Sequence, residues 1–263
     1  MVPYCRHRSF VGRDDTLGDM MALLTVSLDQ VGALRDARKL MEPDPVQAAV
    51  LAELAGANGL AVQLRRDRRY IRDRDLYMLR EAVKTRLTIE MAPVDENVEK
   101  ALEVKPSMVS LVADYADTDT PVAGIDFDNP MVDFSDIALR LKGVGIGVCF
   151  FVEPDADAVR GAARAGATVV MLNCGGFTQA RTLEEAQQEL DRIDRAAQAA
   201  AKAGLPVHAA RGVGYNNVSP LRELNLIDDF VVGHAIVSRA VLCGFDRAVR
   251  DMLRLIGPRS LPA

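Results

Sequence analysis

Short apolar runs alternate with longer amphipathic stretches over most of the chain. The runs are rich in Val, Ile and Leu, as is typical of buried parallel strands, and they span 22–28, 59–64, 86–91, 108–112, 145–151, 168–172, 205–210 and 229–232. Apolar residues at helical spacing predict helices between them over 44–57, 73–84, 95–103, 133–142, 155–165, 183–203, 217–224 and 235–256. Strands that alternate with helices in this way indicate a parallel sheet.

Local signals agree with these elements. Asp44 and Pro45 provide an N-cap and a proline at the first helical position, and Gly56, Gly166 and Gly204 end helices just before strands. Strand–helix units repeated eight times predict a (β/α)8 TIM barrel, a single domain over 21–263. The alternative is an open doubly wound sheet, but its first turn should carry G-x-G-x-x-G, and 29–38 does not.

Composition narrows the class of protein. The 263 residues fit one barrel, and 49% hydrophobic with 26% charged residues excludes general disorder. A net charge of −5 argues against a nucleic-acid partner, and no apolar run approaches the roughly 20 residues that cross a bilayer. The four cysteines are far apart and the first residues lack an apolar leader, so we expect reduced thiols and a cytoplasmic protein. Residues 1–20 are expected to form an N-terminal extension, unless Met20 or Met21 is the true start.

Polar residues gather at the carboxyl ends of the predicted strands, where barrels of this type carry their active sites. Side chains alternate between the barrel interior and the helix layer, so residues two positions apart share a face. If the polar set faces inward, the mouth of the barrel holds Asp29, Gln63, Arg65, Glu90, Asn173 and Arg211. His208 has the opposite parity to Arg211, and we expect it to face the helix layer.

Two carboxylates and two arginines in one cavity suit an anionic, oxygen-rich ligand. Arginine binds phosphate or carboxylate bidentately, and a buried carboxylate can act as a base. The alternative is an ion-pair network with a purely structural role.

Glycines follow the seventh and eighth predicted strands, at Gly212, Gly214 and Gly233, and His234 comes next. Glycines let backbone N–H groups approach an anion, and these two loops are the recurrent phosphate site of the fold. We therefore predict a phosphate here, with ordinary turn glycines as the alternative.

Other candidate chemistry is weaker. His7, His208 and His234 lack metal-ligand spacing, and Cys174 has no histidine beside it, so we expect no metal ion and no cofactor. The basic run at 65–74 is interrupted by aspartates and is typical of a solvated loop rather than a nucleic-acid site. The acidic segment 113–132 is expected to be a long loop after the fourth strand.

Several segments resemble the pyridoxine 5′-phosphate synthase family. They are S-L-D-Q at 27–30, P-D-P-V-Q-A-A at 43–49, L-R-R-D-R-R at 64–69, E-M-A at 90–92 and G-H-A-I at 233–236. The resemblance runs from about residue 22 to 256. It implies a (β/α)8 fold, a homo-oligomer (usually an octamer), and phosphorylated small-molecule substrates. The implied reaction condenses 1-deoxy-D-xylulose 5-phosphate with 3-amino-2-oxopropyl phosphate, closes the pyridine ring of vitamin B6, and releases phosphate and water.

The resemblance also implies roles for residues. The positions matching the family's phosphate- and substrate-binding residues are Asp29, Arg38, Arg65, Thr120, Gly212, Gly233 and His234, and the matching acid/base residue is Glu90. Other family positions differ: Gln63 and Arg211 replace histidines, Met171 replaces a glutamate, and Ser27, Gln30 and Tyr70 replace substrate-side residues. We count Glu90, Arg211 and Gln63 as the catalytic candidates, and add Ser27, Gln30, Tyr70 and Asn173 to the substrate-binding set.

These replacements favour three hypotheses in turn. The first is a divergent enzyme that uses Glu90 as general base on a phosphorylated keto or amino substrate, with Arg65 and Arg211 stabilising anions. In this enzyme the parent ring closure would be impaired, because glutamine and arginine do not exchange protons near neutral pH. The second is a non-catalytic phosphometabolite-binding or regulatory protein. The third is an authentic synthase in which Tyr70 or His208 replaces the missing imidazoles.

Overall fold

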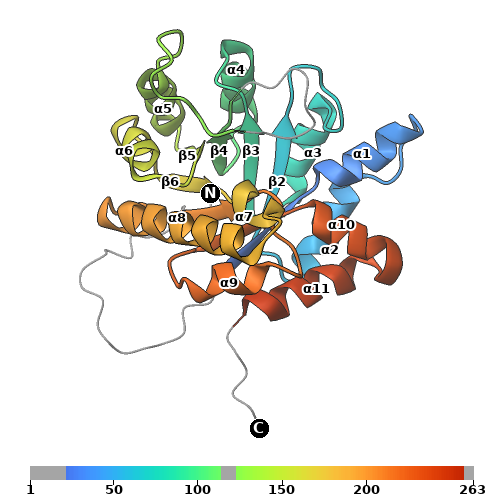
Figure 1. Ribbon diagram of the computed structural model, residues 1–263. Helices are drawn as coiled ribbons and strands as arrows, with labels where there is room; N and C mark the ends of the chain where they lie inside the picture. The colour runs from blue at the N-terminus through green and yellow to red at the C-terminus, as the bar shows by residue number, and fades with distance from the viewer. Residues whose placement is uncertain (1–21, 114–122, 258–263) are drawn as a thin grey trace.

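The computed structural model describes residues 22–113 and 123–257 of the chain. All strands run parallel and close into one barrel in the order β1 to β8, with helices around the outside (Figure 1). The strands are β1 (Leu23–Ser27), β2 (Gly59–Leu64), β3 (Arg86–Met91), β4 (Met108–Leu111), β5 (Gly147–Val152), β6 (Val169–Asn173), β7 (Val207–Ala210) and β8 (Asp229–Val232). The predicted (β/α)8 barrel is therefore confirmed.

The helices cover the barrel and connect consecutive strands. They are α1 (Asp29–Ala37), α2 (Pro45–Ala55), α3 (Asp73–Ala82), α4 (Asp95–Val104), α5 (Phe134–Gly143), α6 (Ala156–Arg164), α7 (Gly175–Gln179), α8 (Leu183–Lys202), α9 (Val218–Glu223), α10 (His234–Cys243) and α11 (Phe245–Ile256). Asp44 caps α2 by accepting a hydrogen bond from the Val46 amide, and Gly56 ends the helix with φ 108°, as the local signals predict.

Helices α1 and α7 were not predicted from the sequence, and α10 and α11 were predicted as one helix. Helix α1 was missed because its buried face includes Arg35, which interrupts the apolar spacing, and α7 was missed because it is short and begins with two glycines. The single helix predicted over 235–256 is wrong. Gly244 has φ 87° and separates α10 from α11, because a left-handed residue cannot continue a right-handed helix.

Two apolar layers hold the barrel together. The larger lies between the strands and the helices, where Leu24, Ile89, Phe150 and Phe230 are inaccessible to solvent. The smaller fills the barrel itself and includes Ala61, Met108, Cys149, Phe151, Val169, Met171, Ala210 and Val231. Burial of both faces of each strand explains why the strands read as continuous apolar runs.

Strand register corrects the predicted orientation of His208. Met171 on β6 is paired with His208 on β7, and Met171 belongs to the barrel interior. His208 therefore faces the interior, and Ala209 faces the helix layer. Parity counted back from Arg211 was misleading, because Arg211 lies beyond the end of β7 and has φ 73°, which takes it out of the strand alternation.

Candidate active site at the barrel mouth

Asp29 is held at the mouth of the barrel by two neighbouring strands. It is the first residue of α1, directly after β1; its Oδ1 accepts a hydrogen bond from the Gln63 backbone N–H at 2.7 Å, and its Oδ2 accepts one from Ser27 Oγ at 2.9 Å. Burial raises the pKa of Asp29 in spite of these hydrogen bonds and of the nearby charge of Arg65. Asp29 therefore contacts both the Ser27 side chain of β1 and the Gln63 backbone of β2.

Glu90 lies on β3 directly beside Gln63 of β2 in the strand register. Burial, and after it the charge of Asp29, raise the pKa of Glu90 to about 8. A carboxyl group with this pKa is mostly protonated at neutral pH and still exchanges its proton readily there. Glu90 can therefore act as an acid as well as a base under ordinary conditions.

The loop after β2 brings a guanidinium group to the same end of the barrel. Arg65 is only 6% exposed, and its Nε and Nη2 donate to Asp67 at 3.0 and 2.9 Å. This hydrogen bonding from Arg65 holds the pKa of Asp67 well below its usual range. Tyr70 follows in the same loop with φ 71° and is half-buried. The Arg65 charge also acts on Asp29, so the loop contributes positive charge to the mouth.

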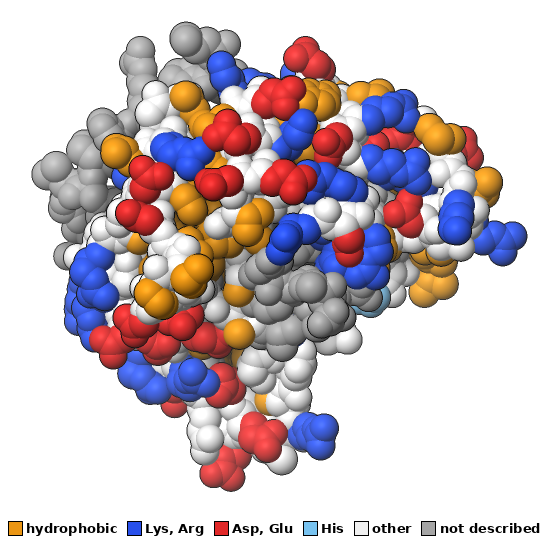
Figure 2. Space-filling view, turned by 90° about the horizontal axis from the view of Figure 1, so that it is seen from above, with side chains coloured by type: hydrophobic (Ala, Val, Ile, Leu, Met, Phe, Trp, Pro, Cys, Tyr) orange, Lys and Arg blue, Asp and Glu red, His pale blue; other side chains and the backbone are white. Residues whose placement is uncertain are grey.

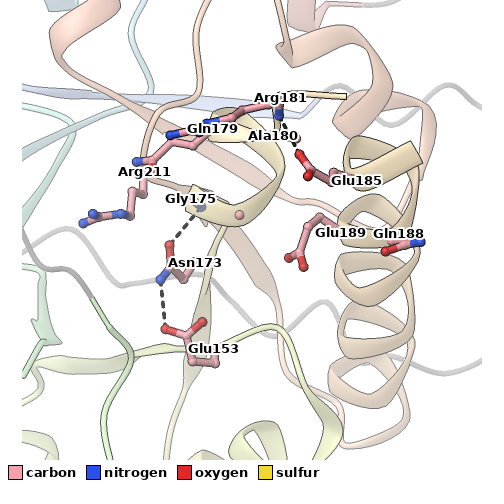
Figure 3. Close-up of a pocket in the computed structure, with 11 residues that line it drawn as sticks. Glu153, Asn173, Gly175, Gln179, Ala180, Arg181, Glu185, Gln188, Glu189 and Arg211 are labelled. Carbon is pink, nitrogen blue, oxygen red and sulfur yellow. Dashed lines mark hydrogen bonds between the residues drawn. The ribbon is translucent and has the colours of Figure 1, made fainter. Parts of the chain in front are cut away.

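Asn173 and Arg211 lie beside a cavity of about 580 Å³ that is lined by residues from four consecutive parts of the chain (Figure 3). Asn173 is the last residue of β6; its Nδ2 donates to Glu153 Oε1 at 2.9 Å, and its Oδ1 accepts from the Gly175 amide at 2.9 Å. Arg211 lies against Gly175: its Nε is 2.8 Å from the position that a Cβ on that glycine would occupy.

The loops after β7 and β8 meet next to this cavity. The position of a Cβ on Gly214 is 3.0 Å from the Cβ of Ala235, in the first turn of α10. Gly233 precedes α10, and the helix has no side-chain cap at its amino end. The uncapped N–H groups of the first turn, with the positive end of the helix dipole, suit an anion. Gly212 has φ 73° and packs against the side chain of Thr178, which leaves no room for a side chain.

The remaining predicted residues occupy less central positions. Gln30 is half-buried in the first turn of α1, Arg38 is exposed just after that helix, and His234 is exposed as the first residue of α10. Thr120 lies outside the described residues, as do residues 1–20 and part of the predicted loop 113–132.

Part of the cavity wall is formed by residues that were not predicted from the sequence. Glu153 follows β5, and Gly176, Gln179 and Glu189 belong to α7 and α8. Glu153 could have been found by the rule that functional side chains follow strand ends. The others could not, because only the docking of α7 onto α8 brings them to the mouth.

A separate polar cluster lies at the opposite end of the barrel. Arg86 and Asp229 are the first residues of β3 and β8; they form an ion pair, and Thr25 Oγ1 donates to Asp229 at 2.8 Å. His208 Nε2 is 3.9 Å from Asp229 Oδ2, and burial lowers the pKa of His208 to about 4. This histidine is therefore neutral at physiological pH and remote from the mouth.

Further features of the described residues restrict the chemistry. The described residues contain no group of three or more His, Cys, Asp or Glu side chains arranged to hold a metal ion. In the ranges 22–113 and 123–257, no helix has the length and apolar character needed to span a membrane. Burial raises the pKa of the Cys174 thiol to about 12, so this cysteine stays protonated and is a poor nucleophile. On the face seen in Figure 2, acidic and basic side chains are interspersed, and no single-sign patch dominates.

Comparison with known proteins identifies relatives over almost the whole described chain. Residues 24–258 match the model of the family described as "Pyridoxal phosphate biosynthesis protein PdxJ". The chain is 46% identical over 236 residues to the pyridoxine 5′-phosphate synthase of Geobacter sulfurreducens, covering 90% of this chain and 99% of that protein. It is 44% identical to the protein of the same name from a Synechococcus strain, with the same coverage. A solved structure, thiamine phosphate pyrophosphorylase from Pyrococcus furiosus, has a TM-score of 0.56 at 16% identity and covers 90% of this chain and 96% of that one, which shows a shared fold.

Proposed function

The chain belongs to the family of pyridoxal phosphate biosynthesis proteins that includes the pyridoxine 5′-phosphate synthases, and we propose that it forms pyridoxine 5′-phosphate itself. Its two reactants would be 1-deoxy-D-xylulose 5-phosphate and 3-amino-2-oxopropyl phosphate. The observation that carries the proposal is the identity of 46% over 99% of a relative of that name. A likeness of this extent without large gaps favours the same reaction over the divergent chemistry that the replaced histidines had suggested.

The raised pKa of Glu90 answers the main objection to this function, which is that two histidines able to transfer protons are replaced. Gln63 and Arg211 cannot shuttle protons at neutral pH, and His208 is too deep and too weakly basic to replace the missing imidazoles. Glu90, however, has a pKa of about 8, within two units of an ordinary histidine. We therefore assign it the proton transfers at the reacting carbons, as an acid in its protonated form and as a base in its ionised form.

The phosphate groups would be held at two places. The amino end of α10, directly after Gly233, would offer backbone N–H groups to one phosphate, together with the loop that contains Gly212. Arg65, aided by Arg38 and Thr120, would bind the other. Asp29, Ser27, Gln30 and Tyr70 would contact the sugar-derived reactant. Ser27 Oγ donates a hydrogen bond to Asp29, and the Tyr70 amide donates one to Asp36 of α1, which brings the loop after β2 close to α1.

A second candidate function is related chemistry on a different phosphorylated keto or amino compound. It is favoured by the pairing of Gln63 with Glu90 in the strand register and by the position of Arg211 at the cavity. A neutral amide and a permanent cation stabilise an enolate or a carboxylate but move no protons.

The test is direct assay of the purified chain with both named reactants, with detection of pyridoxine 5′-phosphate. We expect product, and Glu90→Gln should reduce the rate by about 10²- to 10⁴-fold, the usual contribution of one general acid/base. Ser238→Ala, on the exposed face of α10, is the matched control and should leave the rate unchanged.

A double variant separates the two candidate functions. If related chemistry is correct, wild type forms no product, and Gln63→His with Arg211→His should restore some. If neither protein forms product and both bind the reactants, the chain is a phosphometabolite-binding protein, and the proposed function is wrong.

We further propose a cytoplasmic homo-oligomer, an octamer by family resemblance. Light scattering of the purified protein measures the mass directly, and a monomer of 28.6 kDa would contradict it.

A further inference from the structure

The cavity beside the barrel mouth has a lining of mixed charge that the proposed reaction does not use in full. It lies between α7, the first turns of α8 and the ends of β5 and β6, and it shares Asn173 and Arg211 with the mouth (Figure 3). At about 580 Å³ it has room for a small metabolite.

Arg211 lacks a counter-ion within the described residues. Its Nη1 is buried and has no hydrogen-bond acceptor, although a buried donor of this kind ordinarily has one. The side chain packs against Gly175, and its Cδ and Nε lie 3.0 and 2.8 Å from the position of a Cβ there. Met171, two residues before Asn173 on β6, is apolar and cannot compensate the charge. An anionic group of a ligand would complete this site.

Two further carboxylates line the cavity. Glu153 uses Oε1 to accept hydrogen bonds from Asn173 Nδ2 at 2.9 Å and from the Gly124 amide at 2.7 Å, and its other oxygen accepts none from a described residue. Glu189 reaches inward from α8 and packs against Gly176, where any larger residue would collide with it. Figure 3 shows both carboxylates on the cavity side of their elements.

Of the other charged residues that line the cavity, Glu185 and Glu189 already have partners, and Arg181 is exposed to solvent. Glu185 Oε2 accepts hydrogen bonds from the Arg181 and Thr182 amides, at 2.8 and 3.3 Å, as part of the capping box of α8. Both oxygens of Glu189 accept hydrogen bonds from Arg192 Nη1, at 2.9 and 3.1 Å, so this carboxylate is already paired. Glu153 therefore remains to receive a cation, and Arg211 lacks an anion.

We propose that this cavity binds a small amino acid, with its carboxylate on Arg211 and its ammonium group on Glu153, at the carboxylate oxygen that accepts no hydrogen bond from a described residue. The planar guanidinium fork matches a carboxylate in two parallel hydrogen bonds, and an ammonium group donates three to surrounding oxygens. A zwitterion compensates Arg211 and Glu153 at once, whereas an anion or a cation alone compensates only one of the two. The inference rests on the proposed function only in placing this ligand next to the reacting groups.

Calorimetry with glycine, β-alanine and 4-aminobutyrate tests the proposal, because this series increases the separation of ammonium and carboxylate. One member should bind, and the matching compounds with a single charge, acetate and methylamine for example, should bind at least tenfold more weakly. Arg211→Gln and Glu153→Gln should each weaken that binding by about 10- to 100-fold, as expected for a lost charge-assisted hydrogen bond. Equal binding of single-charge compounds, or no binding of any amino acid at about 10 mM, would overturn the proposal.

Three controls keep the result interpretable. Arg195→Gln changes an exposed charge on α8 that does not line the cavity and should leave the affinity unchanged. Gly175→Ala should push Arg211 and Asn173 out of position and weaken binding while the chain stays folded, as circular dichroism would show. Glu90→Gln should bind the amino acid as wild type does. A chain that binds the amino acid but forms no pyridoxine 5′-phosphate contradicts the proposed function alone, and a chain that forms product without binding any amino acid contradicts this inference alone.

Discussion

Asp29 and Glu90 share one barrel mouth, and the carboxylate of Asp29 adds to the larger effect of burial in bringing the pKa of Glu90 to about 8. Asp29 is itself fixed by hydrogen bonds from Ser27 and Gln63. Like charges held this close disfavour ionisation of both groups. The proton-exchanging group of the site is therefore tuned by a neighbour on a different element.

Removing the charge of Asp29 should shift the pH dependence of activity. Asp29→Asn keeps an oxygen for the Gln63 amide but lowers the pKa of Glu90, because only burial then raises it. If Glu90 acts as the base, the rise of kcat with pH should move to lower pH. Ser27→Ala removes a hydrogen bond to Asp29 without changing charge and is the control. Identical pH profiles for Asp29→Asn and wild type would contradict the coupling.

Glu90 should also make the protein less stable in alkali. Its folded pKa of about 8 exceeds the unfolded value near 4.5, so the native state holds the proton more tightly. Its contribution to stability is therefore largest at low pH and is lost as pH rises through about 8. The urea midpoint of unfolding should change less between about pH 6 and about pH 9 for Glu90→Gln than for wild type.

His208 predicts the opposite trend in acid. Its folded pKa of about 4 is below the ordinary 6.5, so the unfolded state binds the proton first and stability falls as pH drops from about 6.5 through 4. At about pH 5 the free energy of unfolding should be lower by about 2 kcal/mol for this reason. Urea unfolding of His208→Gln should lack this part of the pH dependence. An unchanged acid response in this variant would mean that His208 is already charged when folded.

Asp75 should be among the most sensitive positions for stability. It accepts hydrogen bonds from Arg35 Nη1 and Nη2 at 3.1 and 2.6 Å, both side chains are about 1% exposed, and Arg35 also donates to the Tyr70 carbonyl at 2.7 Å. Asp75→Ala leaves a buried guanidinium unpaired and should lower the free energy of unfolding by about 3–5 kcal/mol.

The exposed pair of Arg160 with Asp157 is the matched control. Asp157→Ala should change the free energy of unfolding by less than about 1 kcal/mol. Because the Arg35 pair also holds the loop with Arg65 and Tyr70, Arg35→Lys should raise KM for the phosphorylated ketose more than it lowers kcat. Equal costs for Asp75→Ala and Asp157→Ala in denaturant titrations would contradict this account.

Two glycines with nearly the same φ angle allow the cost of backbone strain to be distinguished from the cost of steric crowding. Gly204 and Gly212 have φ 71° and 73°, but a Cβ at Gly204 meets open space, whereas one at Gly212 collides with Thr178. Gly204→Ala should cost about 1–2 kcal/mol of backbone strain. Gly212→Ala should cost more and weaken the binding of inorganic phosphate. Thermal unfolding and phosphate titration of both variants check this, and equal costs would place the crowding elsewhere.

The amino-acid sequence by itself determined the architecture. Apolar runs separated by amphipathic stretches leave a closed parallel barrel as the economical way to bury both faces of every strand. The same pattern located Glu90, Asn173 and the glycine loops after β7 and β8, because strand ends in this fold converge on one face.

Tertiary structure decided what periodicity cannot express. Arg211 reaches the cavity because it lies beyond the end of β7 and itself adopts a left-handed backbone conformation. His208 faces the interior because β7 pairs with β6 in one particular register. Helix α1 buries an arginine whose partner is 40 residues away, and the cavity exists only because α7 docks on α8. The pKa of Glu90 likewise depends on its surroundings. Each of these depends on contacts between residues distant in the chain, and a local pattern carries no information about them.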